Sequence, residues 1–381
     1  MRIAVIRQRY NPYGGAERFV ARALGALKAQ GAQVTIVARE WQVAAGATLL
    51  RVDPFHLGRL WRDWSFARAV CARLGTERFD LVQSHERLAC CDLYRAGDGV
   101  HRQWLANRSR VAGPLERLAT RLSPYHRYVL AAEARMFAAE RLRAVICNST
   151  MVREEIRRHF NVADDKLHVL YSGVDLDAFS PRLRDAHRAR QRRELGIGED
   201  APVFLHVGSG FARKGVERLL AALAGEREAR SRLLVVGHDK AQAQMRRAAG
   251  RLGVAHRVHF AGGQADVKPW YGAADCFVLA TLYDPFPNAA LEALASGLPI
   301  IVSRQCGAAE LVEEGVNGHV RDALDVAGFA EAMAAVAARG PATMAGAARR
   351  SVAHLSLEAM GERLVALYRR LLGEEAAGPR V

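Results

Sequence analysis

Short apolar segments that are typical of strands alternate along this chain with amphipathic segments that are typical of helices. Short connections join them, and this order predicts α/β domains with parallel sheets. A glycine pair, Gly14 and Gly15, follows the first strand and opens a helix over 16–30. The other predicted strands of the first half lie at 33–38, 79–83, 144–147 and 167–170, after the first at 2–6. Those of the second half lie at 202–207, 232–236, 257–260, 276–280 and 299–302.

The length of 381 residues exceeds one typical core and predicts two domains. We place an N-terminal domain at 1–172 and a second at 173–355, with a polar, Arg-rich stretch at 180–200 separating the two sets of strands. A last amphipathic helix within 356–381 either completes the second domain or folds back onto the first, and we favour the return. Two parallel-sheet domains in series predict a ligand cleft between them, facing the carboxyl ends of their strands.

Composition narrows the class of protein. Half of the residues are hydrophobic and a quarter are charged, as in ordinary globular proteins. No apolar run reaches the roughly 18 residues that a membrane-spanning helix needs. The N-terminus lacks the apolar block of a signal peptide, so we expect a cytoplasmic protein. The net charge of +15 predicts an anionic partner: a nucleic acid, a phosphorylated ligand or the inner face of a membrane.

The cysteines give little sign of a metal site. There are six of them, without CxxC spacing and without a companion His pattern. A zinc site is therefore not expected, and reduced, buried thiols are the default prediction.

The segment 281–299, TLYDPFPNAALEALASGLP, predicts a turn that leads into an apolar helix beginning near Asn288. Asp284 then lies in the loop before the helix, and Glu292, eight positions later, lies one turn inside it. Backbone N–H groups at such a helix start favour an anion such as a phosphate. Phosphate on the helix start and hydroxyls on a carboxylate suit a nucleotide sugar. Alternatively, Asp284 only caps the helix and Glu292 lies on the surface.

A second candidate motif is HVGSGFARKGVERLLAAL, residues 206–223, which predicts a strand, a glycine-containing loop and a helix. Arg213 and Lys214 place two cations just before the helix, where they suit a diphosphate. The segment is neither a dinucleotide fingerprint, because the third glycine is missing, nor a Walker loop, because no Ser or Thr follows the Lys. The alternative is a solvated basic turn.

Two further segments of the first half are candidates for site residues. Gly15, in the glycine pair after the first strand, permits close approach of a ligand to the main chain, or merely forms the turn. Residues 84–105 are dense in titratable groups, including His85, Asp98 and His101. Asp98 lies between glycines, which indicates an exposed loop, whereas a single His is more often structural than functional.

Residues 101–130 are strongly basic, and leucines and aromatic residues are interleaved among their arginines. A basic amphipathic stretch of this kind can lie on an anionic membrane surface, where each cation contributes about 1 kcal/mol. It can equally be a solvated helix face packed on its own domain. The arginines that we assign to the membrane surface are Arg102, Arg108, Arg110, Arg117 and Arg121.

Together these motifs resemble the retaining glycosyltransferases of family 4, which share the GT-B fold of two facing Rossmann-like domains with a cleft between them. The resemblance extends over nearly the whole chain, from the early glycine pair to the last helix. Its most specific parts are GSGFARKGVERLLAAL (208–223) and YDPFPNAALEALASGLP (283–299). The segment DLYRAGD (92–98) is similar to the subgroup that acts on the lipopolysaccharide inner core.

The resemblance implies roles for the candidate residues. Arg213 and Lys214 would hold the donor diphosphate, and Gly15 would line it from the other domain. Glu292 would bind the ribose hydroxyls. Asp284 would contact the transferred sugar and its phosphate, together with backbone amides around Phe286, Pro287 and Asn288. Asp98 would be an acid at the reaction centre on the acceptor side, and His85 a possible sugar contact.

One departure from the family pattern concerns Asp284, where the motif usually has Glu. The carboxylate is shorter by one methylene, which bears on donor identity. Residues 101–130 align with a membrane-associating region of the subgroup, so the resemblance implies a peripheral protein on the cytoplasmic face of the inner membrane.

The implied reaction is transfer of a hexose, glucose from UDP-glucose, to a heptose of the lipopolysaccharide core with retention and without a metal or other cofactor. An alternative within the family uses UDP-GlcNAc, UDP-galactose or GDP-mannose, or another glycan acceptor, and a donor screen separates these. A nucleotide-sugar epimerase would invert the sugar without an acceptor. A basic nucleic-acid-binding protein is a different class, but no DNA- or RNA-binding signature supports it. A salt-dependent gel shift without nucleotide-sugar binding would favour it.

Overall fold

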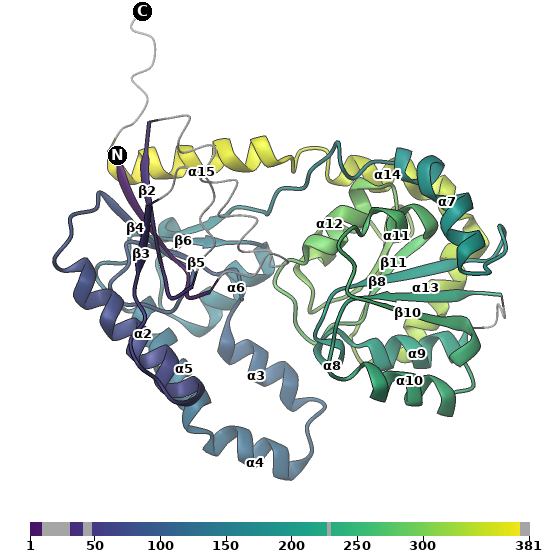
Figure 1. The fold of residues 1–381 in the computed structure, drawn as a ribbon, viewed down its shortest axis with the longest axis horizontal. Helices are drawn as coiled ribbons and strands as arrows, with labels where there is room; N and C mark the ends of the chain where they lie inside the picture. Colours follow the sequence, from purple (N-terminus) through teal and green to yellow (C-terminus); the bar gives the residue numbers. More distant parts are fainter. Residues whose placement is uncertain (10–30, 41–47, 227–229, 374–381) are drawn as a thin grey trace, which may run out of the picture. The chain divides into compact units, whose positions relative to one another are not determined.

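The computed structural model describes residues 1–9, 31–40, 48–226 and 230–373. The chain forms two compact units (Figure 1). Unit 1 comprises Met1–Gly173 and the segment from Leu357 onward, and unit 2 comprises Val174–Ser356. The helix expected at 16–30 and the glycine pair before it lie outside the described residues. None of the helices in the described ranges has the length and apolar character needed to cross a membrane.

Unit 1 is built on a seven-stranded sheet in the order β3-β2-β1-β4-β5-β6-β7, and every pairing is parallel. Its strands are β1 (Arg2–Ile6), β2 (Gln33–Ala38), β3 (Thr48–Arg51), β4 (Leu81–Ser84), β5 (Leu93–Arg95), β6 (Ala144–Cys147) and β7 (Leu167–Val169). The five strands predicted for this half are confirmed within two residues. Strands β3 and β5 were not predicted: β3 has no buried residue, and β5 includes the polar Arg95 among its three residues.

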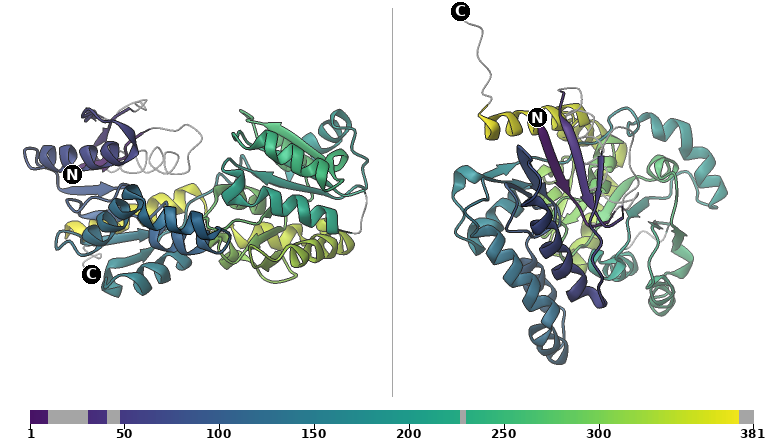
Figure 2. Two further views of the ribbon diagram at one scale, coloured as in Figure 1. Left: turned by 90° about the horizontal axis from the view of Figure 1, so that it is seen from below. Right: turned by 60° about the vertical axis from the view of Figure 1, so that its left-hand side comes forward.

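Helices cover both faces of this sheet, because successive strand residues point to opposite sides. Ala4 and Ile6 of β1 pack with one group of helices, and Ile3 and Val5 with the C-terminal helix α15 on the other face (Figures 1 and 2). The helices are α2 (Gly58–Leu74), α3 (His101–Ser109), α4 (Pro114–Leu122), α5 (Pro124–Phe137), α6 (Thr150–His159) and α15 (Leu357–Leu372). The last helix of the chain therefore belongs to the core of unit 1.

Unit 2 is built on a six-stranded parallel sheet in the order β10-β9-β8-β11-β12-β13. The strands are β8 (Val203–Val207), β9 (Arg232–Val236), β10 (Val258–Gly262), β11 (Cys276–Leu279), β12 (Ile300–Ser303) and β13 (Gly318–Arg321). The helices are α7 (Arg182–Glu194), α8 (Phe211–Lys214), α9 (Val216–Gly225), α10 (Gln242–Arg251), α11 (Lys268–Ala273), α12 (Asn288–Ala295), α13 (Val326–Arg339) and α14 (Pro341–Ser351). The five predicted strands are confirmed, and only β13 was not predicted.

The Arg-rich stretch at 180–200 lies between the two sets of strands, as predicted, but it is a folded part of unit 2. It contains α7, which belongs to unit 2, and Arg192 of this helix is buried. The Arg192 guanidinium donates to the Asp275 carboxylate and to the Ala273 carbonyl oxygen at the end of α11. A sequence pattern does not distinguish a buried, paired arginine from a solvated one.

Both sheets have the same topology. Counted from the first strand of each unit, both contain the order 3-2-1-4-5-6, and unit 1 adds a seventh strand after the sixth. In such sheets the chain reverses direction across the sheet between the first and fourth strands, and ligands bind at the carboxyl ends of the strands there. This point lies between β1 and β4 in unit 1, and between β8 and β11 in unit 2. The candidate site residues follow these strands.

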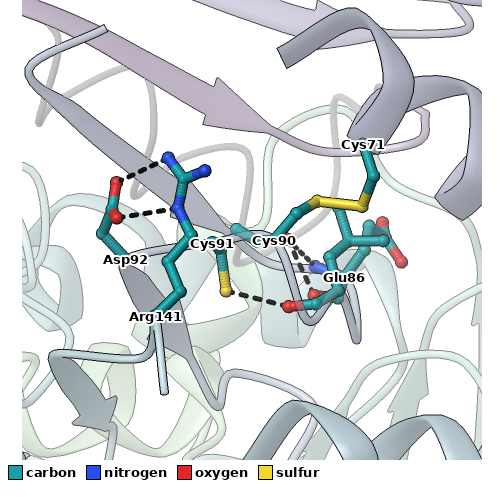
Figure 3. Close-up of a disulfide and its surroundings, with 8 residues drawn as sticks. Cys71, Glu86, Cys90, Cys91, Asp92 and Arg141 are labelled. Carbon is teal, nitrogen blue, oxygen red and sulfur yellow. Dashed lines mark hydrogen bonds and ion pairs between the residues drawn. A yellow bond between two sulfur atoms is a disulfide. The ribbon is translucent and has the colours of Figure 1, made fainter. Parts of the chain in front are cut away.

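A disulfide corrects the expectation that all the cysteines are reduced thiols. Cys71 of α2 is bonded to Cys90 in the loop after β4, with the Cα atoms 5.7 Å apart (Figure 3). The pair was missed because only the packing of α2 beside this loop brings the two residues within bonding reach. The remaining cysteines are buried free thiols: Cys91, Cys147, Cys276 and Cys306. Burial raises the pKa of the Cys91 and Cys147 thiols to about 12.

Candidate functional site

In unit 2, the loop after β8 turns tightly through glycines. Gly208 and Gly210 have φ angles of 138° and 79°. A Cβ on Gly208 would lie 2.7 Å from Lys214 Nζ, so the missing side chain makes room for the lysine. Gly215, with φ of 77°, stands where α9 begins, and a Cβ there would collide with the Ala280 carbonyl oxygen. The loop therefore brings Lys214 back over its own main chain, close to the end of β11.

The segment after β11 has the form that the sequence predicted. Helix α12 begins at Asn288 and Glu292 lies in its second turn. The residue before the helix is Pro287, and no side chain caps its first amides, so Asp284 is not a helix cap. Glu292 is only 6 % exposed, so it is not a surface residue either. Both structural alternatives for these acids are therefore wrong.

Ion pairs join the loop after β8 to the segment after β11. Asp284 Oδ2 lies 3.4 Å from a guanidinium nitrogen of Arg213 and 3.4 Å from Lys214 Nζ. The same Arg213 nitrogen donates to the Tyr283 carbonyl oxygen at 2.6 Å. Asp284 itself is held by main-chain bonds, its N–H to the Gln305 carbonyl oxygen and its carbonyl oxygen to the Gly307 N–H. One buried carboxylate thus faces two cations, and this cluster retains a net positive charge.

The residues around α12 are already positioned by neighbours. The Tyr271 hydroxyl donates to Glu292 Oε2 at 2.9 Å. Phe286 and Pro287 are buried, and Asn288 is partly buried. The structure therefore brings Arg213, Lys214, Asp284 and the start of α12 together at the edge of the unit 2 sheet where β8 and β11 end.

Two residues near this cluster were not singled out from the sequence. Asp239 follows β9 and accepts hydrogen bonds from the Gly210 and Phe211 N–H groups at 2.6 and 3.0 Å. Its pKa is lowered, since these bonds and that of the Ala241 N–H outweigh the effect of burial. His206 lies within β8, and burial, then the charge on Lys214, lowers its pKa to about 3. An acid three residues after a predicted strand was the available signal for Asp239.

The candidate residues of unit 1 lie after β4 and β5. His85 is buried, with its Nε2 3.0 Å from Gln83 Nε2, and the Tyr368 hydroxyl of α15 donates to the Gln83 amide oxygen. Burial lowers the pKa of His85 well below its usual value, and Arg95 and Arg7 add to this effect. His85 is therefore a neutral imidazole held by the core. Gly15 lies outside the described residues.

Asp98 is an exposed acid surrounded by arginines. Its side chain is 57 % exposed, and Asp98 Oδ2 lies 3.4 Å from the Arg7 guanidinium. The pKa of Asp98 is lowered: desolvation by its neighbours raises it, but Arg7, Arg87 and Arg95 outweigh that effect. Arg7 also lies 3.7 Å from Glu86 Oε1. Asp98 is thus an ionised carboxylate at neutral pH, on the same loop edge as His85.

The basic stretch at 101–130 is folded as α3, α4 and the first half of α5. In α4 no residue is buried, and Leu115, Leu118 and Leu122 are exposed on one face, Leu115 to 83 %. Arg117 and Arg121 are exposed beside them, whereas Arg108 is paired with Glu116 at 2.7 Å. Arg102 stacks on Phe160, and Arg110 is exposed. The packed-face alternative therefore does not hold for α4.

Glu133 of α5 is a further residue that the sequence did not single out. It is buried and accepts from the His101 N–H at 2.9 Å, the Arg102 N–H at 3.3 Å and Arg87 Nε at 3.1 Å. It therefore fixes the start of α3 and the loop that carries Arg87. Within the described ranges, no three His, Cys, Asp or Glu side chains gather in a way that could hold a metal ion.

Comparison with known proteins agrees with this geometry. The family model "Glycosyltransferase Family 4" matches residues 13–178, and "Glycosyl transferases group 1" matches residues 201–339. The lipopolysaccharide glucosyltransferase WaaG of Escherichia coli is 27 % identical over 326 residues, which is 84 % of this chain and 85 % of that protein.

Solved structures agree in fold. A crystal structure of WaaG, described as a glycosyltransferase involved in lipopolysaccharide biosynthesis, superposes with a TM-score of 0.82 at 24 % identity, over 96 % of this chain and 99 % of that one. Anabaena HepE in complex with UDP and glucose has a TM-score of 0.72 at 20 % identity, over 97 % of this chain and all of that one.

Proposed function

Because the chain belongs to the family 4 glycosyltransferases of the GT-B fold, we propose that it transfers glucose from UDP-glucose to a heptose of the lipopolysaccharide core, with retention at the anomeric carbon. Its likeness to the Escherichia coli lipopolysaccharide glucosyltransferase supports the acceptor class. The HepE structure, which holds UDP and glucose, supports the donor. The observation that carries the proposal is the convergence of Arg213 and Lys214 on Asp284 where β8 and β11 end.

Departure of the nucleoside diphosphate is the demanding step of this reaction. Arg213 and Lys214 stabilise the negative charge that develops on the leaving phosphate, an electrostatic effect that is usually the largest single contribution to catalysis. The uncapped amides at the start of α12 add partial positive charge on the same side. These groups supply the charge that a metal would otherwise supply. When the diphosphate binds, it takes over the two cations that Asp284 holds in this structure.

The remaining donor contacts that we propose lie at the same edge of the unit 2 sheet, where β8 and β11 end. Glu292, oriented by Tyr271, accepts hydrogen bonds from the ribose hydroxyls. Asp284, with the main chain of Phe286, Pro287 and Asn288, contacts the transferred sugar. In the fully buried β11–α12 connection these groups are fixed before the donor arrives, so little ordering is needed on binding.

Unit 1 supplies the acceptor side. Asp98, ionised at neutral pH, positions the attacking hydroxyl or accepts its proton. His85, as a neutral imidazole, hydrogen-bonds a hydroxyl of the transferred sugar. Gly15 lets the diphosphate approach the main chain.

The exposed leucines and exposed arginines of α4 support peripheral binding to an anionic membrane on the cytoplasmic side. Trp61 and Trp64 on the first turns of α2 add exposed aromatic side chains, which favour the membrane–water interface. Sedimentation with vesicles containing phosphatidylglycerol tests this: Leu115→Glu with Leu118→Glu should release the protein. Binding that both changes leave intact would contradict it.

The donor role is tested by Lys214→Ala. We expect turnover with UDP-glucose to fall at least about tenfold with the fold intact, because the leaving diphosphate loses one of its two cations. Lys240→Ala is the matched control, since Lys240 is exposed in the following βα loop. Unchanged kinetics in Lys214→Ala would contradict the diphosphate role.

A screen of melting temperatures with UDP-GlcNAc, UDP-galactose and GDP-mannose tests donor identity. If one of these raised the melting temperature more than UDP-glucose does, it would replace UDP-glucose as the proposed donor.

A further inference from the structure

The loop that joins β5 to α3 carries Asp98, and side chains from other elements hold its main chain. The Gly97 carbonyl oxygen accepts a hydrogen bond from the Asn148 amide at 3.3 Å. The Gly99 carbonyl oxygen accepts one from Arg87 Nη2 at 3.5 Å. The Asp98 side chain itself is exposed. The position of this carboxylate therefore depends on the groups that hold the loop and the start of α3.

One buried carboxylate is bound both to that arginine and to the start of α3. Glu133 of α5 is 1 % exposed and accepts from Arg87 Nε at 3.1 Å. It also accepts from the main-chain N–H groups of His101 and Arg102, at 2.9 and 3.3 Å. The residue before α3 provides no side-chain cap, so Glu133 supplies the acceptor for the first amides of this helix. Glu133 thus joins α5, the start of α3 and the arginine that contacts the loop of Asp98.

We propose that Glu133 is a positioning residue for the transfer reaction, and that it acts through Arg87 on the acceptor-side acid Asp98. The inference rests on the proposed function and adds to it a group that touches no substrate. A neutral hydroxyl or amide is enough to cap a helix, whereas burying a charge is costly unless the charge is paired. The charge on Glu133 is therefore explained by its ion pair with Arg87 rather than by the cap.

Arg87 also belongs to the charges that act on Asp98. Arg7 contacts the Asp98 carboxylate directly at 3.4 Å, whereas Arg87 reaches the loop through Gly99. Both arginines lower the pKa of Asp98, and Glu133 balances the charge of Arg87. The titratable groups of this network are Arg7 after β1, His85, Glu86 and Arg87 after β4, Tyr94 and Arg95 of β5, His101 of α3 and Glu133 of α5.

A comparable ion pair at the other end of the same strand provides the control. Asp92, just before β5, accepts from the Val82 N–H at 2.8 Å and from Arg141 Nε at 3.0 Å (Figure 3). Like Glu133, it is a carboxylate of unit 1 that binds both an arginine and a main-chain amide. Asp98 follows β5, so a change at Asp92 removes the same kind of contact away from the loop of Asp98.

The first test is a double-mutant cycle with the full chain. Glu133→Gln keeps the shape and an acceptor for the His101 N–H but removes the charge that holds Arg87. We expect kcat for transfer from UDP-glucose to a delipidated core oligosaccharide ending in heptose to fall about tenfold, because the acid is misplaced. The calorimetric Kd for UDP-glucose should stay within about twofold. In the Asp98→Asn background, Glu133→Gln should change kcat less than about twofold, because the group on which Glu133 acts is gone. Asp92→Asn should leave kcat and this Kd as they are in the natural chain.

The second test follows Asp98 itself and needs no activity. NMR of the full chain with ¹³C-labelled aspartate carboxyls measures the titration of Asp98, whose signal is identified by its loss in Asp98→Asn. Arg87→Met removes a cation that lowers the pKa of Asp98, so this carboxyl should titrate at a higher pH. Glu133→Gln leaves that cation unbalanced and should shift the titration to a lower pH. Arg141→Met should not move it.

The combined variant Glu133→Gln with Arg87→Met leaves neither partner as an unpaired buried charge, so it serves if a single change unfolds unit 1. It should lower kcat about as much as Glu133→Gln alone. A natural kcat in this variant, or an equal loss of kcat on Glu133→Gln in the natural and Asp98→Asn backgrounds, would overturn the proposal. A titration of Asp98 that neither Arg87→Met nor Glu133→Gln moves would do the same.

Failure of the natural chain to transfer glucose would instead refute the proposed function. The NMR titrations would then still decide whether Arg87 and Glu133 act on Asp98.

Discussion

The two units have the same strand order, yet they use the end of the first strand differently. In unit 2 the loops after β8 and β11 meet, and Arg213, Lys214 and Asp284 form an ion cluster in which only Arg213 is substantially exposed. In unit 1 the Gln8 N–H after β1 donates to Glu86 Oε1 after β4 at 3.0 Å, and Asp98 is exposed among arginines. One arrangement gathers two cations around a buried carboxylate, and the other gathers arginines around an exposed one.

The different charges on these loops indicate which substrate each unit suits. A diphosphate needs fixed cations and main-chain amides, and unit 2 provides both on short glycine-containing loops. The acceptor-side role that we propose for unit 1 needs an ionised carboxylate, and Asp98 among Arg7, Arg87 and Arg95 provides it. The topology sets only the place of the sites, whereas the loop residues set their chemistry.

The largest expected effect separates the two units by kinetics. Asp98→Asn should lower kcat at least about 100-fold and leave the Kd for UDP-glucose unchanged, because it removes the charge on the acceptor side alone. Glu292→Gln should raise the Kd for UDP-glucose about ten- to hundredfold, since a charged hydrogen-bond acceptor is lost while Tyr271 keeps its partner. Steady-state kinetics and calorimetry on both variants give the comparison.

Glu116→Gln serves as the control, because this acid is exposed on α4 and pairs only with Arg108 among the described residues. The division of labour would fail if Asp98→Asn weakened donor binding as much as Glu292→Gln does.

Much of the fold followed from the sequence, because buried parallel strands are short apolar runs between glycines and polar turns. The strands that were not predicted show what a local sequence pattern lacks. β5 has only three residues, and its buried Arg95 is polar, so its place in the sheet depends on β4 and β6 on either side. No local pattern contains that information.

The parts of the candidate site that depend on the course of the main chain could be predicted from the sequence. The start of α12 at Asn288 and the cations before α9 could be located from glycine, proline and charge. The disulfide and Glu133 were not predicted, because they join segments far apart in sequence. Glu133 and Arg87, for example, lie on a helix and a loop and meet only after both pack on the sheet.

The disulfide should stabilise unit 1 and not unit 2, because both cysteines belong to unit 1. Its removal by Cys71→Ser with Cys90→Ser should lower the free energy of unfolding of unit 1 by about 3 kcal/mol, the cost of closing a loop of this length. The sequence separation is 19 residues. Urea unfolding with and without a reductant measures the change.

Here the variant provides its own control, since a reductant should destabilise the natural chain and leave the double variant unaffected. Six titratable thiols in the unfolded natural chain, found without any reductant, would mean that the bond does not form.

The smallest effect, when it is measured over one pH unit, concerns acid, and it extends the comparison to buried histidines. His206 in unit 2 has a pKa of about 3 because of burial and Lys214, so in the folded protein it stays neutral at pH 5. In the unfolded chain it binds a proton below about pH 6.5. Its contribution to stability is therefore present above pH 6.5 and is lost as the pH falls from 6.5 toward 3, by about 1.4 kcal/mol per pH unit. His206→Gln should flatten the pH dependence of urea unfolding of unit 2 by about that amount, whereas His256→Gln, at an exposed position, should not.

The pKa of His85 in unit 1 is also lowered, so unit 1 should keep its acid sensitivity in the His206 variant. If both units lost it together, their stabilities would be coupled rather than separate.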